Sequence, residues 1–215
     1  PAVEQVRQAV KMKIGKGWGT ALIEDVERVR AARAAIGPAA ELFVDANGGY
    51  TVKEAVRQAA RFADYGVTYF EEPVSSDQLA QLAFVRQQTP LDIAAGEYGY
   101  DPWYFRRMLR ADAVDILQAD ATRCLGFTGW LMVADLAYAF AIPFSAHTAP
   151  TLHAHIGCAA PQLAHVEYFY DHVRIEKMLF DGVLEPIAGH LQPDPTRPGL
   201  GLTLKRQDAD QWRVG

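Results

Sequence analysis

Three similar segments decide the fold: ELFVDAN at residues 41–47, VTYFEEP at 67–73 and LDIAAGE at 91–97. Each segment is an apolar, strand-like run with an acidic residue at or near its end. The three acids, Asp45, Glu71 and Glu97, are separated by equal intervals of 26 residues. Such an interval accommodates one strand, one helix and two short loops, since a parallel crossover needs a dozen or more connecting residues. The spacing therefore predicts parallel strands that are joined by helices.

The same spacing predicts where the three carboxylates lie. The equivalent ends of successive parallel strands meet at one edge of a sheet, so these side chains should converge on one point. Oxygen-only ligands of this kind suit a hard divalent cation, with Mg²⁺ as the first choice. The chain is therefore expected to be an enzyme rather than a binding or structural module.

The rest of the chain continues the alternation of strand and helix patterns. Strands are predicted at residues 9–14, 41–46, 67–72, 91–97, 114–120, 141–147 and 165–170. Helices are predicted at residues 20–36, 51–65, 76–88, from 101 onward, 126–140 and 151–160. Thr51 and Glu54 have the spacing of a capping box, and Asp101-Pro102 suits a helix start. The segment from about residue 180 is rich in Pro and Gly and is expected to be irregular.

The alternation narrows the fold class to a (β/α) barrel or an open doubly wound sheet. Polar residues recur at the carboxyl ends of nearly every strand, whereas an open sheet concentrates them at one switch point. We therefore predict an α/β fold of the TIM-barrel type. A complete barrel takes roughly 250 residues, so we expect an incomplete one of about seven strand–helix units that lacks its first strand. We assign residues 1–180 to the barrel and residues 181–215 to an irregular tail that packs on it.

Composition excludes several classes of protein. The chain has 215 residues, 50% of them hydrophobic, which is ample for one sizeable core. A net charge of −5 argues against nucleic-acid binding. No apolar run reaches the roughly 18 residues of a membrane span, and no signal-peptide pattern is present. Cys124 and Cys158 are expected to be buried free thiols, as in a cytoplasmic protein. The charge and the apolar runs together predict no nucleic-acid or membrane partners.

Five more residues with reactive side chains lie on or at the ends of predicted strands. They are Lys11 and Lys13 on the first strand, Asp120 on the fifth, His147 on the sixth and Glu167 on the seventh. Side chains at positions i and i+2 of a strand share a face, so both lysines can point into the barrel. The ends of all seven strands therefore offer polar groups to one site.

These motifs in this order resemble the enolase superfamily, and within it the mandelate racemase subgroup. The resemblance rests on KMKIG, VDAN, EEP, GE, Asp120, SAH and VEY, and it covers about residues 9 to 170. It implies a Mg²⁺ enzyme that removes the proton α to a carboxylate through an enediolate, with Asp45, Glu71 and Glu97 as the metal ligands. The family's N-terminal capping domain has no counterpart in the sequence, so activity of this chain alone is left open.

The resemblance and the chemistry together assign a role to each remaining residue. Lys13 is the expected base on one face of the substrate, with its pKa lowered by the charge of Lys11 and by partial burial. Lys11 would also pair with a substrate carboxylate oxygen. His147 is the expected acid or base on the opposite face, and Asp120 would fix its tautomer and orientation. Glu167 would donate a hydrogen bond to the substrate carboxylate if burial keeps it protonated.

The leading functional hypothesis is dehydration of an acid sugar, an aldonate or aldarate, by a hydro-lyase. Racemisation or epimerisation of a 2-hydroxy acid by the same residues is an alternative, and an inactive fragment with a binding or assembly role is another. The expected partners are a small-molecule hydroxy-carboxylate substrate and further copies of the chain in a homo-oligomer, because a strand without a neighbour invites association.

Four other residues near the site are given lesser roles. Glu72 follows Glu71 directly and should therefore point to the opposite face as a barrel–helix contact. Arg123 either adds positive charge to the site or forms a surface salt bridge. His153 and His155 fall in the helix after the sixth strand and are expected to be structural.

Overall fold

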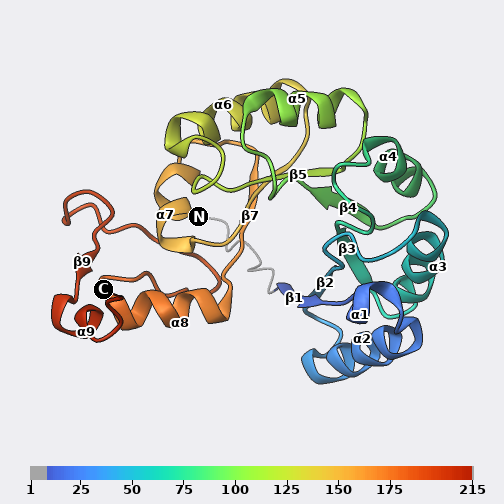
Figure 1. Ribbon diagram of the computed structural model, residues 1–215, viewed down its shortest axis with the longest axis horizontal. Coiled ribbons are helices and arrows are strands. Elements are labelled where there is room, and N and C mark those ends of the chain that lie inside the picture. The colour runs from blue at the N-terminus through green and yellow to red at the C-terminus, as the bar shows by residue number, and fades with distance from the viewer. Residues whose placement is uncertain (1–8, 215) are drawn as a thin grey trace.

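The computed structural model describes residues 9–214. Seven parallel strands form one sheet in chain order (Figure 1). They are β1 Ala9–Lys13, β2 Glu41–Asp45, β3 Val67–Glu71, β4 Asp92–Ala95, β5 Ile116–Ala119, β6 Phe144–Ala146 and β7 Leu163–Val166. The described residues contain a second, two-stranded antiparallel sheet, made of β8 Phe180–Asp181 and β9 Thr203–Leu204.

Helices connect the parallel strands and cover the outer side of the sheet (Figure 1). They are α1 Lys16–Gly19, α2 Leu22–Ile36, α3 Val52–Ala63, α4 Leu79–Gln87, α5 Pro102–Arg110, α6 Gly126–Ala139 and α7 Pro150–Gly157. Two more helices, α8 Tyr170–Leu179 and α9 Arg206–Asp210, follow β7. None of the described helices has both the length and the apolar character that crossing a membrane requires.

The sheet curls into a half-barrel with β1 at one end and β7 at the other (Figure 1). Each strand pairs in parallel with its neighbour in sequence, from β1 with β2 to β6 with β7. All carboxyl ends therefore lie at the same edge, where the polar residues of the chain gather. The predicted fold class, a barrel of about seven strand–helix units, is confirmed.

Local sequence signals explain where two of the helices begin. The Thr51 backbone N–H and hydroxyl both donate to Glu54 at the start of α3, at 3.0 and 2.7 Å. Asp101 precedes α5 and accepts from the backbone N–H of Tyr104 at 2.8 Å, with Pro102 in the first helical position. Capping of this kind satisfies N–H groups that have no partner inside the helix.

The core lies between the sheet and the helices, and strand residues alternate between that core and the inside of the half-barrel. On β3, Phe70 packs against Phe62 of α3 with ring centroids 5.8 Å apart. Its neighbour Tyr69 faces the other way and stacks on Phe43 of β2 at 4.6 Å. Because Glu71 shares the face of Tyr69, the alternation directs this carboxylate into the half-barrel.

The structure differs from the sequence-based expectation in several places, among them the short helix α1 at residues 16–19, for which no helix was predicted. The seventh strand covers Leu163–Val166, so Glu167 follows it, and α8 occupies residues 170–179, for which no helix was predicted. The segment after residue 180 is mostly irregular but contains β8, β9 and α9. Cys124 is buried as expected, whereas Cys158 is exposed, because it follows the last turn of α7 at the surface.

Candidate active site

Three buried acids stand together at the carboxyl ends of adjacent strands. Asp45 is the last residue of β2, Glu71 is the last residue of β3, and Glu97 lies two residues beyond β4. One carboxylate oxygen from each residue lies within 4.8 Å of the other two. The exposed fractions are 0% for Asp45, 0% for Glu71 and 4% for Glu97. Residues that are 26 positions apart in sequence thus share one water-poor centre.

This centre has the composition of a site for a hard cation. Glu71 Oε1 is buried and has no hydrogen-bond partner within residues 9–214, which leaves an acceptor that a cation would satisfy. Burial raises the pKa of Glu71 well above its usual value, and a cation bound to this carboxylate would favour its ionised form. An all-carboxylate donor set suits Mg²⁺ and similar oxygen-binding ions. The residues present therefore fit a divalent cation.

A glycine makes the approach of Glu97 possible. Gly96 has a φ of 139°, a conformation that side chains of L-residues rarely adopt. A Cβ atom at this position would lie 1.9 Å from the backbone oxygen of Gln118 on β5. The strand end that carries Glu97 can therefore lie against β5 only because residue 96 has no side chain.

Lys11 and Lys13 flank the acids on the β1 side. Lys11 Nζ lies 2.6 Å from Glu71 Oε2 and 2.7 Å from Glu167 Oε1. Burial by itself would lower the pKa of Lys11, but the charges of the surrounding carboxylates outweigh it and the net pKa is raised. Lys13 contacts Asp45, and its side chain is 43% exposed. Lys11 is thus a permanent buried cation, whereas Lys13 stands at the rim.

His147 and Asp120 flank the acids on the β6 side. His147 Nδ1 lies 2.9 Å from Asp120 Oδ2, and its Nε2 lies 3.2 Å from Glu97 Oε2. Asp120 Oδ1 accepts from the backbone N–H and the hydroxyl of Thr122 at 2.8 and 2.7 Å. Burial alone would raise the pKa of Asp120, yet the hydrogen bonds from His147 and Thr122 lower it to about 2. An ionised Asp120 holds the proton on Nδ1 and leaves Nε2 facing the acids.

Glu167 requires a correction. We expected burial to keep its carboxyl protonated, and burial does act in that direction. The Lys11 amine at 2.7 Å more than compensates, so the pKa of Glu167 is lowered and the group is ionised. Its other oxygen, Oε2, accepts from the backbone N–H of Thr148 at 3.1 Å. In this structure Glu167 is therefore an acceptor that anchors Lys11.

Glu72 directly follows the end of β3. It has a left-handed φ of 40°, so the two-residue period of the strand does not set its direction. Its buried carboxyl interacts with the Ser76 side chain and with the charges of Glu97 and Asp45. Burial and then these two charges raise the pKa of Glu72 to about 8. Two adjacent acids in the EEP motif were the sequence signal for a second carboxyl near the site. Side chains alternate between faces only within a strand, so this alternation does not apply to Glu72.

Arg123 links the metal side of the site to the histidine side. Its guanidinium donates to the backbone oxygen of Glu97 at 3.0 Å and lies 3.6 Å from Asp120 Oδ2. It also sits over the ring of Tyr98, 5.6 Å from the ring centroid. Of the two roles left open for Arg123, these contacts favour added positive charge in the site over a surface salt bridge.

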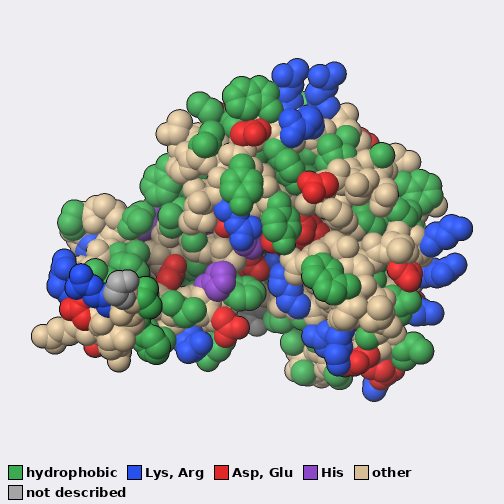
Figure 2. All heavy atoms as spheres, viewed as in Figure 1, with side chains coloured by type: hydrophobic (Ala, Val, Ile, Leu, Met, Phe, Trp, Pro, Cys, Tyr) green, Lys and Arg blue, Asp and Glu red, His purple; other side chains and the backbone are tan. Residues whose placement is uncertain are grey.

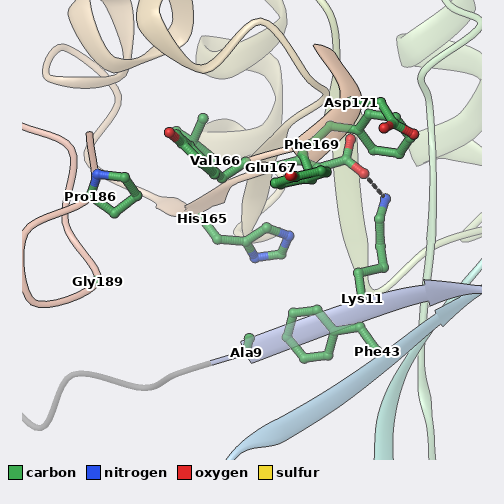
Figure 3. A pocket seen from close by; sticks show the side chains of 12 residues that line it. Ala9, Lys11, Phe43, His165, Val166, Glu167, Phe169, Asp171, Pro186 and Gly189 are labelled. Carbon is green, nitrogen blue, oxygen red and sulfur yellow. Dashed lines mark ion pairs between the residues drawn. The ribbon is translucent and has the colours of Figure 1, made fainter. Parts of the chain in front are cut away.

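A cavity of about 530 Å³ opens beside the site, between β1 and β7 (Figure 3). Lys11 and Glu167 meet across it, and Phe43 and His165 face each other lower down, with ring centroids 5.5 Å apart. Charged side chains of both signs gather near the centre of the face that Figure 2 shows. Two of the proposed site residues, Lys11 and Glu167, thus line this opening.

Comparison with known proteins gives consistent results. The family model described as enolase C-terminal domain-like matches residues 2–209. D-galactarolactone cycloisomerase of Agrobacterium fabrum is 34% identical over 96% of this chain and 57% of its own length. Other curated relatives include acid-sugar dehydratases. The chain therefore spans little more than half the length of the curated relatives it matches first.

Two solved structures resemble this chain in three dimensions. A mandelate racemase/muconate lactonizing enzyme-like protein from Rubrobacter xylanophilus is 50% identical, with a TM-score of 0.90 over 96% of this chain and 57% of that one. An enolase from Bradyrhizobium, complexed with magnesium and mandelic acid, is 32% identical, with a TM-score of 0.87 over 99% of this chain and 56% of that one. The order of strand-end residues, the half-barrel and the family match agree, and the chain belongs to the enolase C-terminal domain-like family.

Proposed function

We propose that the full-length protein removes the proton α to a substrate carboxylate in a Mg²⁺-dependent reaction, and that this reaction dehydrates an acid sugar. The observation that carries the proposal is the arrangement of the buried acids between two proton-transfer groups. Asp45, Glu71 and Glu97 end adjacent strands, with Lys13 on one flank and His147 on the other. Solved relatives that bind magnesium and curated relatives that dehydrate acid sugars support it.

The difficulty of the reaction explains why such a site is needed. A proton α to a carboxylate is weakly acidic, because its removal places two negative charges on one small group. Mg²⁺ held by the three acids would supply positive charge next to that group. Lys11, which is buried between Glu71 and Glu167, adds a second fixed positive charge. Burial strengthens both effects because little water is present to screen them.

The protein groups then divide the proton transfers between them. Lys13 takes the α proton, and the electrons of the C–H bond form an enediolate. His147, held by Asp120 with Nε2 toward the centre, protonates the β-hydroxyl, which leaves as water when the C–O bond breaks. The resulting enol rearranges to a 2-keto-3-deoxy acid. Glu167 fixes Lys11 where the substrate carboxylate would bind.

Racemisation or epimerisation of a 2-hydroxy acid is the second candidate. Two bases on opposite faces are what that reaction requires, and a solved relative binds mandelic acid, a 2-hydroxy acid. Here Lys13 would remove the α proton and His147 would return one to the other face, without loss of water. Deuterium that enters the α carbon from solvent while the substrate keeps its hydroxyl groups would favour this candidate.

The direct test is to incubate the full-length protein, with Mg²⁺, with a panel of acids. The panel contains D-gluconate, D-mannonate, galactarate, L-talarate and both enantiomers of mandelate. Dehydration predicts a 2-keto-3-deoxy acid from at least one sugar acid and no product after chelation of the metal. Neither product nor deuterium exchange with any acid would contradict both candidates.

A separate measurement tests the metal site without relying on turnover. Titration calorimetry should show Mg²⁺ binding to the wild-type protein and a loss of affinity of at least about 100-fold in Glu71→Gln, which removes a ligand charge. The exposed Glu27, which pairs with Arg30 on α2, provides the matched control Glu27→Gln with unchanged affinity. Equal affinity in all three proteins would mean that the three acids do not hold the cation.

A further inference from the structure

His153 connects the strand ends that carry the Asp120–His147 pair. It lies on α7 and is completely buried. Its ring contacts the backbone directly after Asp120 on one side and directly after His147 on the other. We propose that His153 is a positioning residue that sets the geometry of the Asp120–His147 pair and so of the histidine flank. This inference rests on the proposed function and deepens it.

The hydrogen bonds of the ring define its protonation state. His153 Nε2 lies 2.9 Å from the backbone nitrogen of Ala121 and must accept its hydrogen bond, because a backbone N–H can only donate. The proton therefore resides on Nδ1, which donates to the backbone oxygen of Thr148 at 2.8 Å. The ring is neutral, with both nitrogens occupied, and so cannot itself exchange protons with a substrate.

The segment that His153 holds is strained. Thr148 and Ala149 have left-handed φ values of 46° and 38°, although neither is glycine. Such conformations cost on the order of 1–3 kcal/mol each and persist only where surrounding contacts impose them. The His153 ring holds the Thr148 oxygen, and the His153 backbone N–H donates to the Ala149 oxygen at 3.0 Å. His153 is thus a source of the contacts that keep this turn in place.

The turn at Thr148 and Ala149 affects the position of two groups of the site. His147 immediately precedes it, and the Thr148 backbone N–H donates to Glu167 Oε2 at 3.1 Å. On the other side of the ring, Ala121 immediately follows Asp120. One rigid ring therefore fixes the distance between the backbones of β5 and β6 where Asp120 and His147 meet at 2.9 Å. Release of that ring should let this distance drift.

His155 offers a matched control on the same helix. Its Nδ1 pairs with the backbone oxygen of Thr151 at 2.7 Å, four residues earlier within the helix region. It therefore makes the same kind of bond as His153 but joins no strand ends. His155→Leu should leave the activity unchanged.

The experiment compares His153→Leu, His153→Gln and His155→Leu with His147→Asn across the panel of acids, with Mg²⁺ present. The rates of 2-keto-3-deoxy acid formation and of deuterium entry at the α carbon are measured by NMR, together with Mg²⁺ affinity and thermal stability. His153→Leu should slow the reactions that depend on His147 on the order of 100-fold, since small displacements of catalytic groups have effects of this size. It should leave reactions that His147→Asn does not slow unchanged, and Mg²⁺ affinity should stay the same. Gln offers one acceptor and one donor, so His153→Gln should restore much of the rate.

The possible outcomes separate the inference from the proposed function. If the wild-type protein neither converts nor exchanges any of the acids, or if His147→Asn slows neither product formation nor exchange for any of them, the proposed function fails and the inference fails with it. If His147→Asn slows one of these reactions but His153→Leu does not, the inference alone is wrong. Equal slowing of His147-dependent and His147-independent reactions, or failure of Gln to restore more than Leu, would indicate general structural damage and would also overturn the inference.

Discussion

The two flanks of the metal site are built differently. On the β6 side, His147 is 8% exposed and is held by Asp120, and Thr122 and His153 support the pair. On the β1 side, Lys13 has a 43% exposed side chain, contacts Asp45 and stands on the end strand of the sheet. One flank is enclosed by several layers of contacts, and the other borders solvent.

The difference follows from the chemistry of the two side chains. An imidazole has two distinct nitrogens, and one must be fixed for the other to exchange a proton in a defined direction. A lysine amine can rotate its three hydrogens and needs no such partner, but its charge must be balanced by its neighbours. The enclosure of His147 is therefore a requirement for its role. The β1 flank instead opens onto the cavity of about 530 Å³ between β1 and β7.

Chemical rescue would test this comparison with the largest expected effect. Lys13→Ala should slow α-proton exchange and His147→Ala should slow loss of the β-hydroxyl, each by about 10²–10⁴-fold, the usual contribution of a positioned acid or base. Added methylamine should restore part of the rate in Lys13→Ala, because the removed side chain reached solvent. Added imidazole should not restore His147→Ala, because that site is enclosed. Rates of exchange and of product formation, measured by NMR against the concentration of methylamine or imidazole, provide the answer.

The reverse pattern would break the comparison. Rescue of His147→Ala by imidazole together with no rescue of Lys13→Ala would mean that the histidine flank is the accessible one. Lys13→Ala with full exchange would remove Lys13 from the mechanism altogether. His155→Ala serves as the control, since its loss opens space outside the site.

A second test concerns the two lysines of β1, which lie two residues apart. Lys11→Met should destabilise the Mg²⁺-free protein by about 3–5 kcal/mol, because Glu71 and Glu167 would remain buried without their cation. Lys13→Met should lower the free energy of unfolding by about 1 kcal/mol or less, since the amine is solvated in the unfolded chain and partly solvated in the folded protein. Urea unfolding at pH 8 measures both. Similar losses for the two variants would show that burial does not separate their roles.

The metal triad could be predicted from sequence because its geometry depends on one regular feature. Parallel strands joined by helices repeat at a near-constant interval, so acids at equal spacing must meet at one edge. Their burial and their separation of within 4.8 Å follow from the fold, together with Gly96, which lets Glu97 approach beyond the end of β4. The same holds for Lys11, whose direction is set by the two-residue period of β1.

The states of Glu72, Glu167 and His153 could not be predicted in the same way. Each depends on a backbone conformation or on a contact between distant parts of the chain. Glu72 has a left-handed φ beyond the end of β3, and Glu167 is ionised by Lys11, which lies more than 150 residues earlier. His153 looks in sequence like an ordinary core histidine, and only the strained turn at Thr148 reveals what it holds. Periodicity therefore predicts direction along a strand, and it stops at the strand's end.

The last prediction concerns Glu72, which lies beside the metal centre between the two flanks. Its pKa of about 8 in the fold compares with roughly 4.3 in the unfolded chain. Because the pKa is higher in the folded state, the contribution of Glu72 to folding stability is fully present below about pH 4.3 and is lost as the pH rises towards 8. Glu72→Gln is neutral at every pH, so it should stabilise the Mg²⁺-free protein at pH 8 by on the order of 2–3 kcal/mol and change little at pH 5.

The variant also reports on the charges around it. Glu97 and Asp45 raise the pKa of Glu72, and Lys13 lowers it only as a minor influence. A divalent cation held by those acids would offset their charge, so saturating Mg²⁺ should shrink the stabilisation by Glu72→Gln at pH 8. Thermal unfolding at both pH values, with and without Mg²⁺, measures this, and Glu27→Gln on the exposed face of α2 should show neither effect. A gain that is equal at pH 5 and pH 8 would mean that Glu72 does not titrate between these pH values in the folded protein.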